Sequence, residues 1–120
     1  MDEIRHEHCI PCRGDEPRLN DTEIDELKAQ VPDWEVVEDE GVKKLRRRFK
    51  TGDYHLPPQL VNHLQEVANA EDHHPVIEYE PGHIVIEWWT HAIKGLHRND
   101  FIMAAKTDEI FENAKNETGM

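Results

Sequence analysis

Apolar side chains recur every three or four residues in three stretches of this chain, a period that predicts amphipathic helices. The first helix is predicted to begin after Asn20, whose side chain can cap the free amides in a box-like arrangement with Glu23. The second should run from about Pro58 to Glu71. The third should begin near residue 97, and we expect its tail to fray from Asn113 onward.

Between these helices, the alternation of apolar and polar side chains predicts four strands arranged as two hairpins. The strands are expected at residues 34–37, 42–50, 76–80 and 83–91. Two consecutive hairpins assemble most simply as a four-stranded antiparallel sheet. Helices on one face of that sheet would complete a two-layer α+β domain, in the order helix, hairpin, helix, hairpin, helix.

The composition fits one domain and disfavours several classes of partner. The chain has 120 residues, of which 33% are charged, and we expect an irregular N-terminal arm at residues 1–19 before a domain at 20–120. The formal net charge of -12 disfavours binding to nucleic acid or anionic membranes. In the basic cluster at residues 43–48, Lys44, Arg46 and Arg48 fall on one strand face, which fits a solvated basic face of a hairpin. Without an apparent secretory signal or membrane span, a cytoplasmic protein is expected.

Both cysteines lie in one Cys9-Ile10-Pro11-Cys12 motif in the arm. In an intracellular chain this spacing suggests metal binding or redox chemistry more than a structural disulfide. His6 and His8 bring the number of potential zinc ligands to four. The alternative, which we favour because a single motif is a weak signal, is a mobile arm with two free thiols. Such an arm carries little apolar surface, so deleting residues 1–14 should leave the core folded.

The strongest chemical signal is His73-His74-Pro75, followed by Thr90-His91 and then Asp100. Imidazole can both give and take a proton near neutral pH. Adjacent histidines share neither a strand face nor a helix face, and Pro75 disfavours helical angles at His74, so the pair belongs at a helix end. A third imidazole from a strand end would complete an acid/base pocket. Each histidine alone would more often be an ordinary surface residue, and only their joint spacing indicates catalysis.

This arrangement resembles the pterin-4a-carbinolamine dehydratases, a family of hydro-lyases. The resemblance rests on Glu71–Pro75, Ile84–His91 and Gly95–Phe101, and it extends over roughly residues 20–111. It implies the two-layer fold predicted above. It also implies dehydration of 4a-hydroxytetrahydropterin to quinonoid dihydropterin, without a metal or organic cofactor. The Cys-x-Pro-Cys extension resembles a subgroup that includes plastid proteins.

The resemblance also implies roles for individual residues. His73 and His91 are expected to be the acid/base pair, and His74 is expected to join them by binding and orienting the pterin. The remaining substrate-binding residues are expected to be Pro75, Thr90 and Asp100, although Asp100 could instead simply cap the last helix. Two positions depart from the family pattern, with Asn69 in place of an acidic residue and Pro81-Gly82 in place of an aromatic.

Two further expectations concern partners. Family members commonly assemble as dimers or as tetramers of dimers, so a homodimer or homotetramer is expected. A rival function on the same fold is a non-catalytic assembly or dimerisation factor, such as a Rubisco assembly factor or a transcription coactivator. Fold alone does not decide between the two, but the intact histidine set favours the enzyme with a small-molecule pterin substrate.

Overall fold

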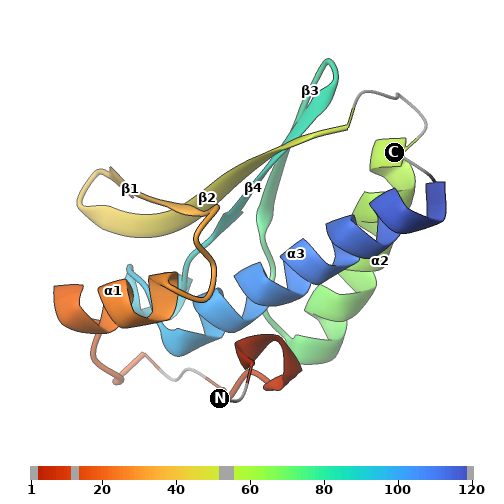
Figure 1. Cartoon of the computed structure of the whole chain (residues 1–120). Coiled ribbons are helices and arrows are strands. Elements are labelled where there is room, and N and C mark those ends of the chain that lie inside the picture. Colours follow the sequence, from red (N-terminus) through yellow and green to blue (C-terminus); the bar gives the residue numbers. More distant parts are fainter. Residues whose placement is uncertain (1–2, 12–13, 52–55, 119–120) are drawn as a thin grey trace.

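The computed structural model describes residues 3–11, 14–51 and 56–118 (Figure 1). Its elements follow the predicted order, with two short 3-10 helices, η1 and η2, added. The helical segments are η1 (Ile4–His6), α1 (Asp21–Lys28), α2 (Leu56–Glu71), η2 (His91–Ile93) and α3 (Arg98–Thr118). The strands are β1 (Glu35–Asp39), β2 (Val42–Lys50), β3 (Val76–Glu80) and β4 (His83–Trp88).

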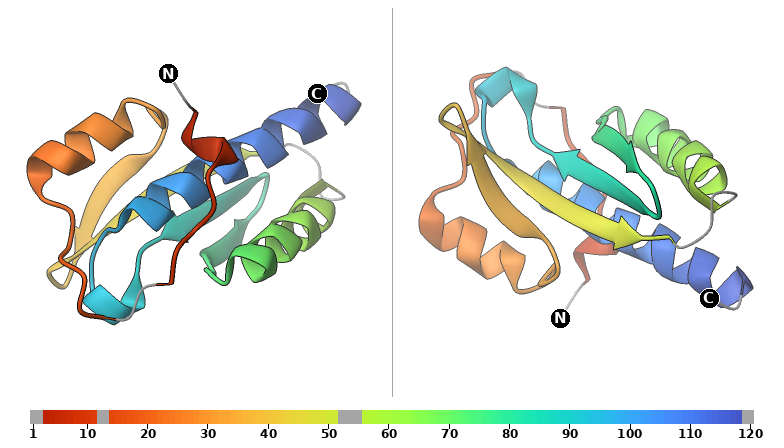
Figure 2. Two further views of the ribbon diagram at one scale, coloured as in Figure 1. Left: turned by 90° about the horizontal axis from the view of Figure 1, so that it is seen from below. Right: turned by 90° about the horizontal axis from the view of Figure 1, so that it is seen from above.

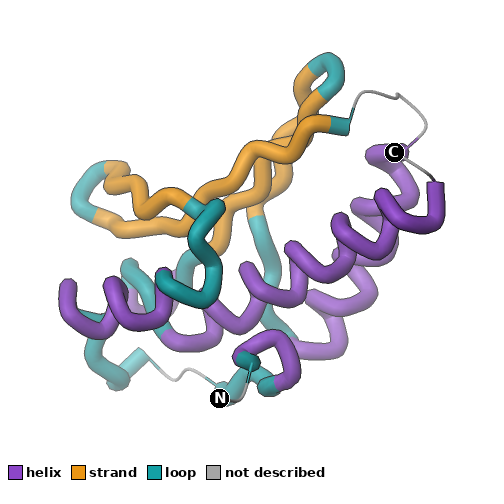
Figure 3. Tube along the Cα trace, viewed as in Figure 1, coloured by secondary structure: helices purple, strands orange, loops and turns teal. Residues whose placement is uncertain are grey.

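The four strands form one antiparallel sheet in the order β1-β2-β4-β3. Helices α1, α2 and α3 all lie on one side of it, as the tube in Figure 3 makes plain. The predicted two-layer α+β architecture is therefore confirmed. On the opposite face Arg46 pairs with Glu87 and Arg48 with Glu80, while Arg47 of the same cluster lies on the helix side and binds Asp108 of α3. No helix in the described ranges is long and apolar enough to span a bilayer.

Local sequence signals explain where most elements begin and end. At the start of α1, Asn20 and Glu23 each bond the other's backbone amide at 2.9 Å, which confirms the predicted capping box. Helix α3 continues past Asn113 to Thr118, and fraying of this tail stays a prediction. Phe111 stacks on Phe49 with ring centroids 3.9 Å apart, and Ala114 packs against the core, so the helix is anchored near its predicted fraying point.

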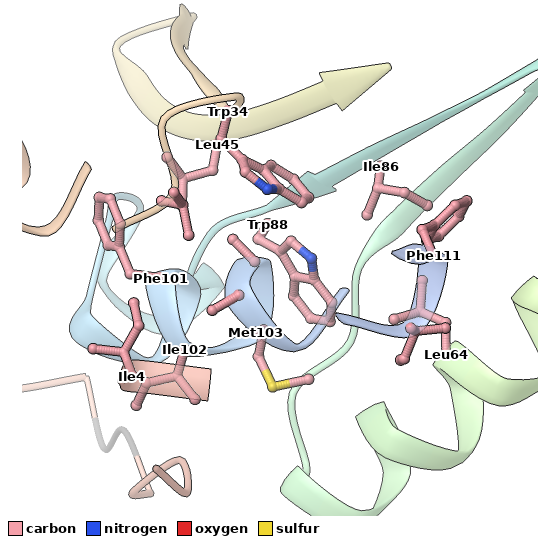
Figure 4. Packing of buried hydrophobic residues seen from close by; sticks show 14 of the residues in the cluster. Ile4, Trp34, Leu45, Leu64, Ile86, Trp88, Phe101, Ile102, Met103 and Phe111 are labelled. Atoms are coloured by element: carbon pink, nitrogen blue, oxygen red, sulfur yellow. The ribbon is translucent and has the colours of Figure 1, made fainter. Parts of the chain in front are cut away.

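The core lies between the sheet and α3, with α2 closing one end (Figure 4). Of the two adjacent indoles, Trp88 is completely buried, while Trp89 is half-buried on the opposite face beneath the ammonium group of Lys44. Strand β4 ends at Trp88, short of the predicted His91. The chain turns there because Thr90 and Gly95 exchange backbone hydrogen bonds across a tight loop.

The N-terminal arm packs against α3, and it crosses this helix in the view from below (Figure 2). Ile4 is only 1% exposed and belongs to the main core, where it lies beside Ile102 (Figure 4). Lys106 bonds the carbonyl of Arg5 at 2.8 Å. The expectation that the arm carries little apolar surface is thus corrected, because Ile4 fills a place that α3 would otherwise expose. The boundary between residues 1–19 and 20–120 remains a prediction.

Candidate active site

The C-terminus of α2 sets the position of His73. Asp72 has a positive φ of 53°. The amides of Asp72 and His73 bond back to the carbonyls of Asn69 and Ala68, respectively. This pattern is a Schellman motif, and aspartate tolerates its left-handed position better than most residues. The motif reverses the chain at the helix end, where the sequence predicted the histidine pair.

Asp100, in the first turn of α3, is completely buried and accepts three hydrogen bonds. His73 Nε2 lies 2.6 Å from one carboxylate oxygen, while Thr90 Oγ1 and the His97 amide bond the other at 2.8 and 2.9 Å. A buried carboxylate needs such donors to offset the cost of leaving water. Asp100 therefore joins the end of α2, the end of β4 and the start of α3.

His91 begins η2, inside the loop that the Thr90–Gly95 bridge closes. Its ring lies against Trp89, with centroids 4.4 Å apart. His74 Nε2 lies 2.8 Å from Asn69 Oδ1, one turn earlier on α2. Asn69, which replaces the acidic residue of the family pattern, thus supplies an acceptor that fixes the orientation of the His74 ring.

These elements surround a pocket of about 700 Å³. Four of the predicted site residues line it together, namely His73, His74, Thr90 and His91. Pro75 and Asp100 are not among its lining residues. Asp100 acts from behind His73, because its side chain is wholly enclosed. The predicted contact of Asp100 with substrate stays a prediction, since the described lining of the pocket does not include this side chain.

The sequence profile of the pterin 4 alpha carbinolamine dehydratase family matches residues 17–110 of this chain, a stretch that contains all these histidines. The chain belongs to this family. Membership of the subgroup with the Cys-x-Pro-Cys extension remains a prediction.

Individual proteins support the same assignment. A Chlorobium limicola protein named as a candidate pterin-4-alpha-carbinolamine dehydratase is 46% identical over 112 residues, covering 93% of this chain and 99% of its own length. A Nitrosococcus oceani protein of the same name is 43% identical, covering 94% of this chain and its full length. The crystal structure of a Brucella melitensis transcriptional coactivator/pterin dehydratase has a TM-score of 0.70 at 24% identity, covering 78% of this chain and 98% of its own. This last likeness concerns the fold.

Sequence reasoning missed part of the pocket wall. Residues His8, Cys9, Ile10 and Pro11 of the arm line the pocket, together with Asn99 and residues at the end of α2. Burial is the main factor that raises the pKa of the Cys9 thiol, to about 12, with help from the nearby charges of Glu71 and Asp100.

The metal candidate falls partly outside the described residues, because Cys12 is not among them. Within the described ranges, no group of three or more histidine, cysteine, aspartate or glutamate side chains is arranged to hold a metal ion. The zinc hypothesis for His6, His8, Cys9 and Cys12 thus stays a prediction. No signal in the sequence could have placed the arm at this pocket, since its contacts come from residues 62 to 90 positions away.

Proposed function

We propose that this chain dehydrates pterin 4a-carbinolamines and that His73 and His91 transfer the protons. In this hydro-lyase reaction the C4a–O bond breaks, a ring nitrogen loses its proton, and a carbon–nitrogen double bond forms in the quinonoid dihydropterin. The departing hydroxide leaves as water once an acid has protonated it. One group must therefore accept a proton while another donates one. The histidines around the pocket meet this need without a metal or an organic cofactor.

The observation that carries this proposal is the hydrogen bond between His73 and Asp100. The carboxylate accepts from Nε2, so the neutral imidazole keeps its lone pair on Nδ1 for proton uptake. When Nδ1 takes up the proton, the buried negative charge of Asp100 stabilises the resulting imidazolium. His73 is accordingly the base.

His91 is assigned as the acid. It lines the pocket from η2, and its side chain is exposed enough to exchange protons with water. His74 is assigned to substrate orientation. Asn69 Oδ1 accepts the Nε2 proton of His74, which leaves Nδ1 as an acceptor for a pterin N–H group. In this assignment two histidines exchange protons with the substrate, and the third binds the pterin.

Turnover of a synthetic 4a-hydroxytetrahydropterin tests the assignment. His73→Ala and His91→Ala should each lower kcat by ~10²–10⁴-fold, the usual contribution of a positioned acid or base. His63 is an exposed histidine on α2 that does not line the pocket, so His63→Ala is the matched control and should keep wild-type turnover. Wild-type rates in both pocket variants would eliminate this mechanism.

We further propose that the chain acts as a homodimer or homotetramer in the cytoplasm. Strands β1 and β3 are the edges of the sheet, and an open edge presents unpaired backbone groups to a second copy. Light scattering at micromolar concentration should give more than one chain per particle, and a clean monomer would refute this.

The rival assembly-factor function is not favoured, because the curated relatives are named for the dehydratase reaction.

A further inference from the structure

The N-terminal segment His8–Pro11 takes no part in the proton transfers proposed above, and it lies outside the stretch that the family profile matches. All four of its residues nevertheless line the histidine pocket. The segment reaches the pocket from η1, after crossing α3 (Figure 2). It therefore forms a wall that the family core does not itself provide.

Glu71 fixes one end of this wall. Its Oε1 accepts the Cys9 amide at 2.7 Å and its Oε2 accepts His8 Nδ1 at 2.8 Å. Burial by itself would raise the pKa of Glu71, but these hydrogen bonds, together with the positive charges of Lys106 and His8, outweigh it and hold that pKa below its usual range. Glu71 immediately precedes the turn that places His73, so the wall and the catalytic histidine share one support.

Asn99 fixes the other end through a two-point contact. Its side-chain oxygen accepts the Ile10 amide at 3.1 Å, and its side-chain nitrogen donates to the Ile10 carbonyl at 2.7 Å. This pairing satisfies both backbone groups of Ile10 and sets the direction of its side chain. Asn99 precedes Asp100 on α3, so this end too is joined to the catalytic groups.

The outcome is an unusual environment for an apolar side chain. Ile10 is 60% exposed although its backbone is bonded on both sides, and it lines a pocket whose other walls carry imidazoles. Covering a fixed apolar surface with a ligand makes the free energy of binding more favourable, because apolar area leaves water and little conformational entropy is lost. The flat face and C6 substituent of a pterin are apolar enough to use such a contact.

We propose that residues 8–11 are a fixed wall of the substrate pocket and that Ile10 is a substrate-binding residue that contacts the bound pterin. This inference rests on the proposed dehydratase function. Ile10 lies on the wall and takes no part in proton transfer, so its contact should stabilise substrate and transition state equally. Such uniform binding affects KM and leaves kcat unchanged.

The first experiment measures kcat and KM with a 6-methyl-4a-hydroxytetrahydropterin. Ile10→Ala should raise KM by about 5- to 30-fold, within the range expected for lost apolar contacts in a pocket, with kcat within about twofold of wild type. Ile10→Leu should restore most of the affinity. Arg5→Ala is the matched control in the same arm, because Arg5 pairs with Glu3 and Glu109 and does not line the pocket. An unchanged KM in Ile10→Ala would overturn the proposal.

A double-mutant cycle tests whether Glu71 acts through the wall. Glu71→Ala should raise KM, and Glu71→Ala combined with Ile10→Ala should be little worse than either change alone, because both remove the same contact. Additive effects would mean that Glu71 acts on the substrate independently of the wall. Glu66→Ala, an exposed glutamate on the same helix, should leave KM unchanged.

Two readouts separate this inference from the dehydratase function itself. Hydrogen exchange should show protected amides at Cys9 and Ile10 in the wild type, and Glu71→Ala should remove the protection at Cys9. Calorimetry with 7,8-dihydro-6-methylpterin, a stable analogue of the product, should show weaker binding by Ile10→Ala even if the wild type has no turnover. Unprotected amides, or an unchanged Kd in Ile10→Ala, would refute the wall whatever the activity.

Discussion

The rings of His73 and Trp88 lie nearly parallel, inclined by 15° with centroids 5.5 Å apart. Trp88 is completely buried, and its indole N–H donates to Thr107 Oγ1 at 3.1 Å. Thr107 in turn donates to the Met103 carbonyl at 2.6 Å. The side chain that supports the proposed base is therefore fixed by a polar chain inside the core, so packing and catalysis are coupled at this point.

Replacing Thr107 tests the contribution of this hydrogen bond to stability. Thr107→Val is close in volume but leaves the buried Trp88 N–H without its acceptor, which should lower the free energy of unfolding by about 1–3 kcal/mol. Thr107→Ser keeps the hydroxyl and should recover most of that loss. Urea denaturation measures both, and equal stability of the two variants would show that the hydrogen bond contributes nothing.

Asp100→Asn should separate the effect of the negative charge of Asp100 from the effect of its size and shape. The amide is similar in size, but it lacks the negative charge that stabilises a protonated His73, and it cannot accept from all three donors. We expect kcat to fall by ~10²–10⁴-fold, by analogy with other aspartate–histidine pairs. Steady-state kinetics with the carbinolamine provides the measurement.

Asp108→Asn is the control for this change. Asp108 also lies on α3 and binds side chains, Trp34 Nε1 at 2.8 Å and Arg47 at 2.6 Å, but it does not line the histidine pocket. This control should alter stability and leave kcat near wild type. If both variants lost turnover to the same degree, the effect of Asp100→Asn would be a general loss of structure.

The sequence predicted the parts of the site that depend on local rules. Asn20 with Glu23 marked the start of α1, and Pro75 marked the helix end that carries the histidine pair. The wall could not be predicted in this way. Its hydrogen bonds join the backbone of Cys9 and Ile10 to Glu71 and Asn99, and backbone groups leave no signature in residue type. The stacking of Phe111 on Phe49, which holds α3 against β2, is likewise a contact that no local period reveals.

Replacing either of two isoleucines of the arm by alanine should affect stability to different degrees. Ile4 is 1% exposed in the main core, so Ile4→Ala should lower the free energy of unfolding by about 2–5 kcal/mol. Ile10 is 60% exposed, so Ile10→Ala should change stability by no more than about 0.5 kcal/mol. Thermal or urea unfolding of the two variants tests this contrast. A small effect of Ile4→Ala would mean that the arm contributes little to the stability of the core.

The Cys9 thiol provides a pH-dependent test of the same wall. Its pKa is raised from 9.0 to about 12, mainly by burial and then by the negative charges of Glu71 and Asp100. Because the folded pKa exceeds the unfolded one, the stability that this thiol contributes is present below pH 9 and is lost as pH rises from 9 towards 12. The thiolate is the form that reacts with alkylating agents, so burial of Cys9 in the wall should suppress its alkylation at neutral pH.

Iodoacetamide labelling of a Cys12→Ser variant isolates Cys9 for this measurement. At pH 8 the native protein should react at least ~10²-fold more slowly than the same chain in guanidinium, and its rate should still be rising at pH 10. Glu71→Gln removes one of the charges and should speed the reaction. A rate that levels off near pH 9 would mean that Cys9 is solvated and that residues 8–11 do not pack against the pocket in solution.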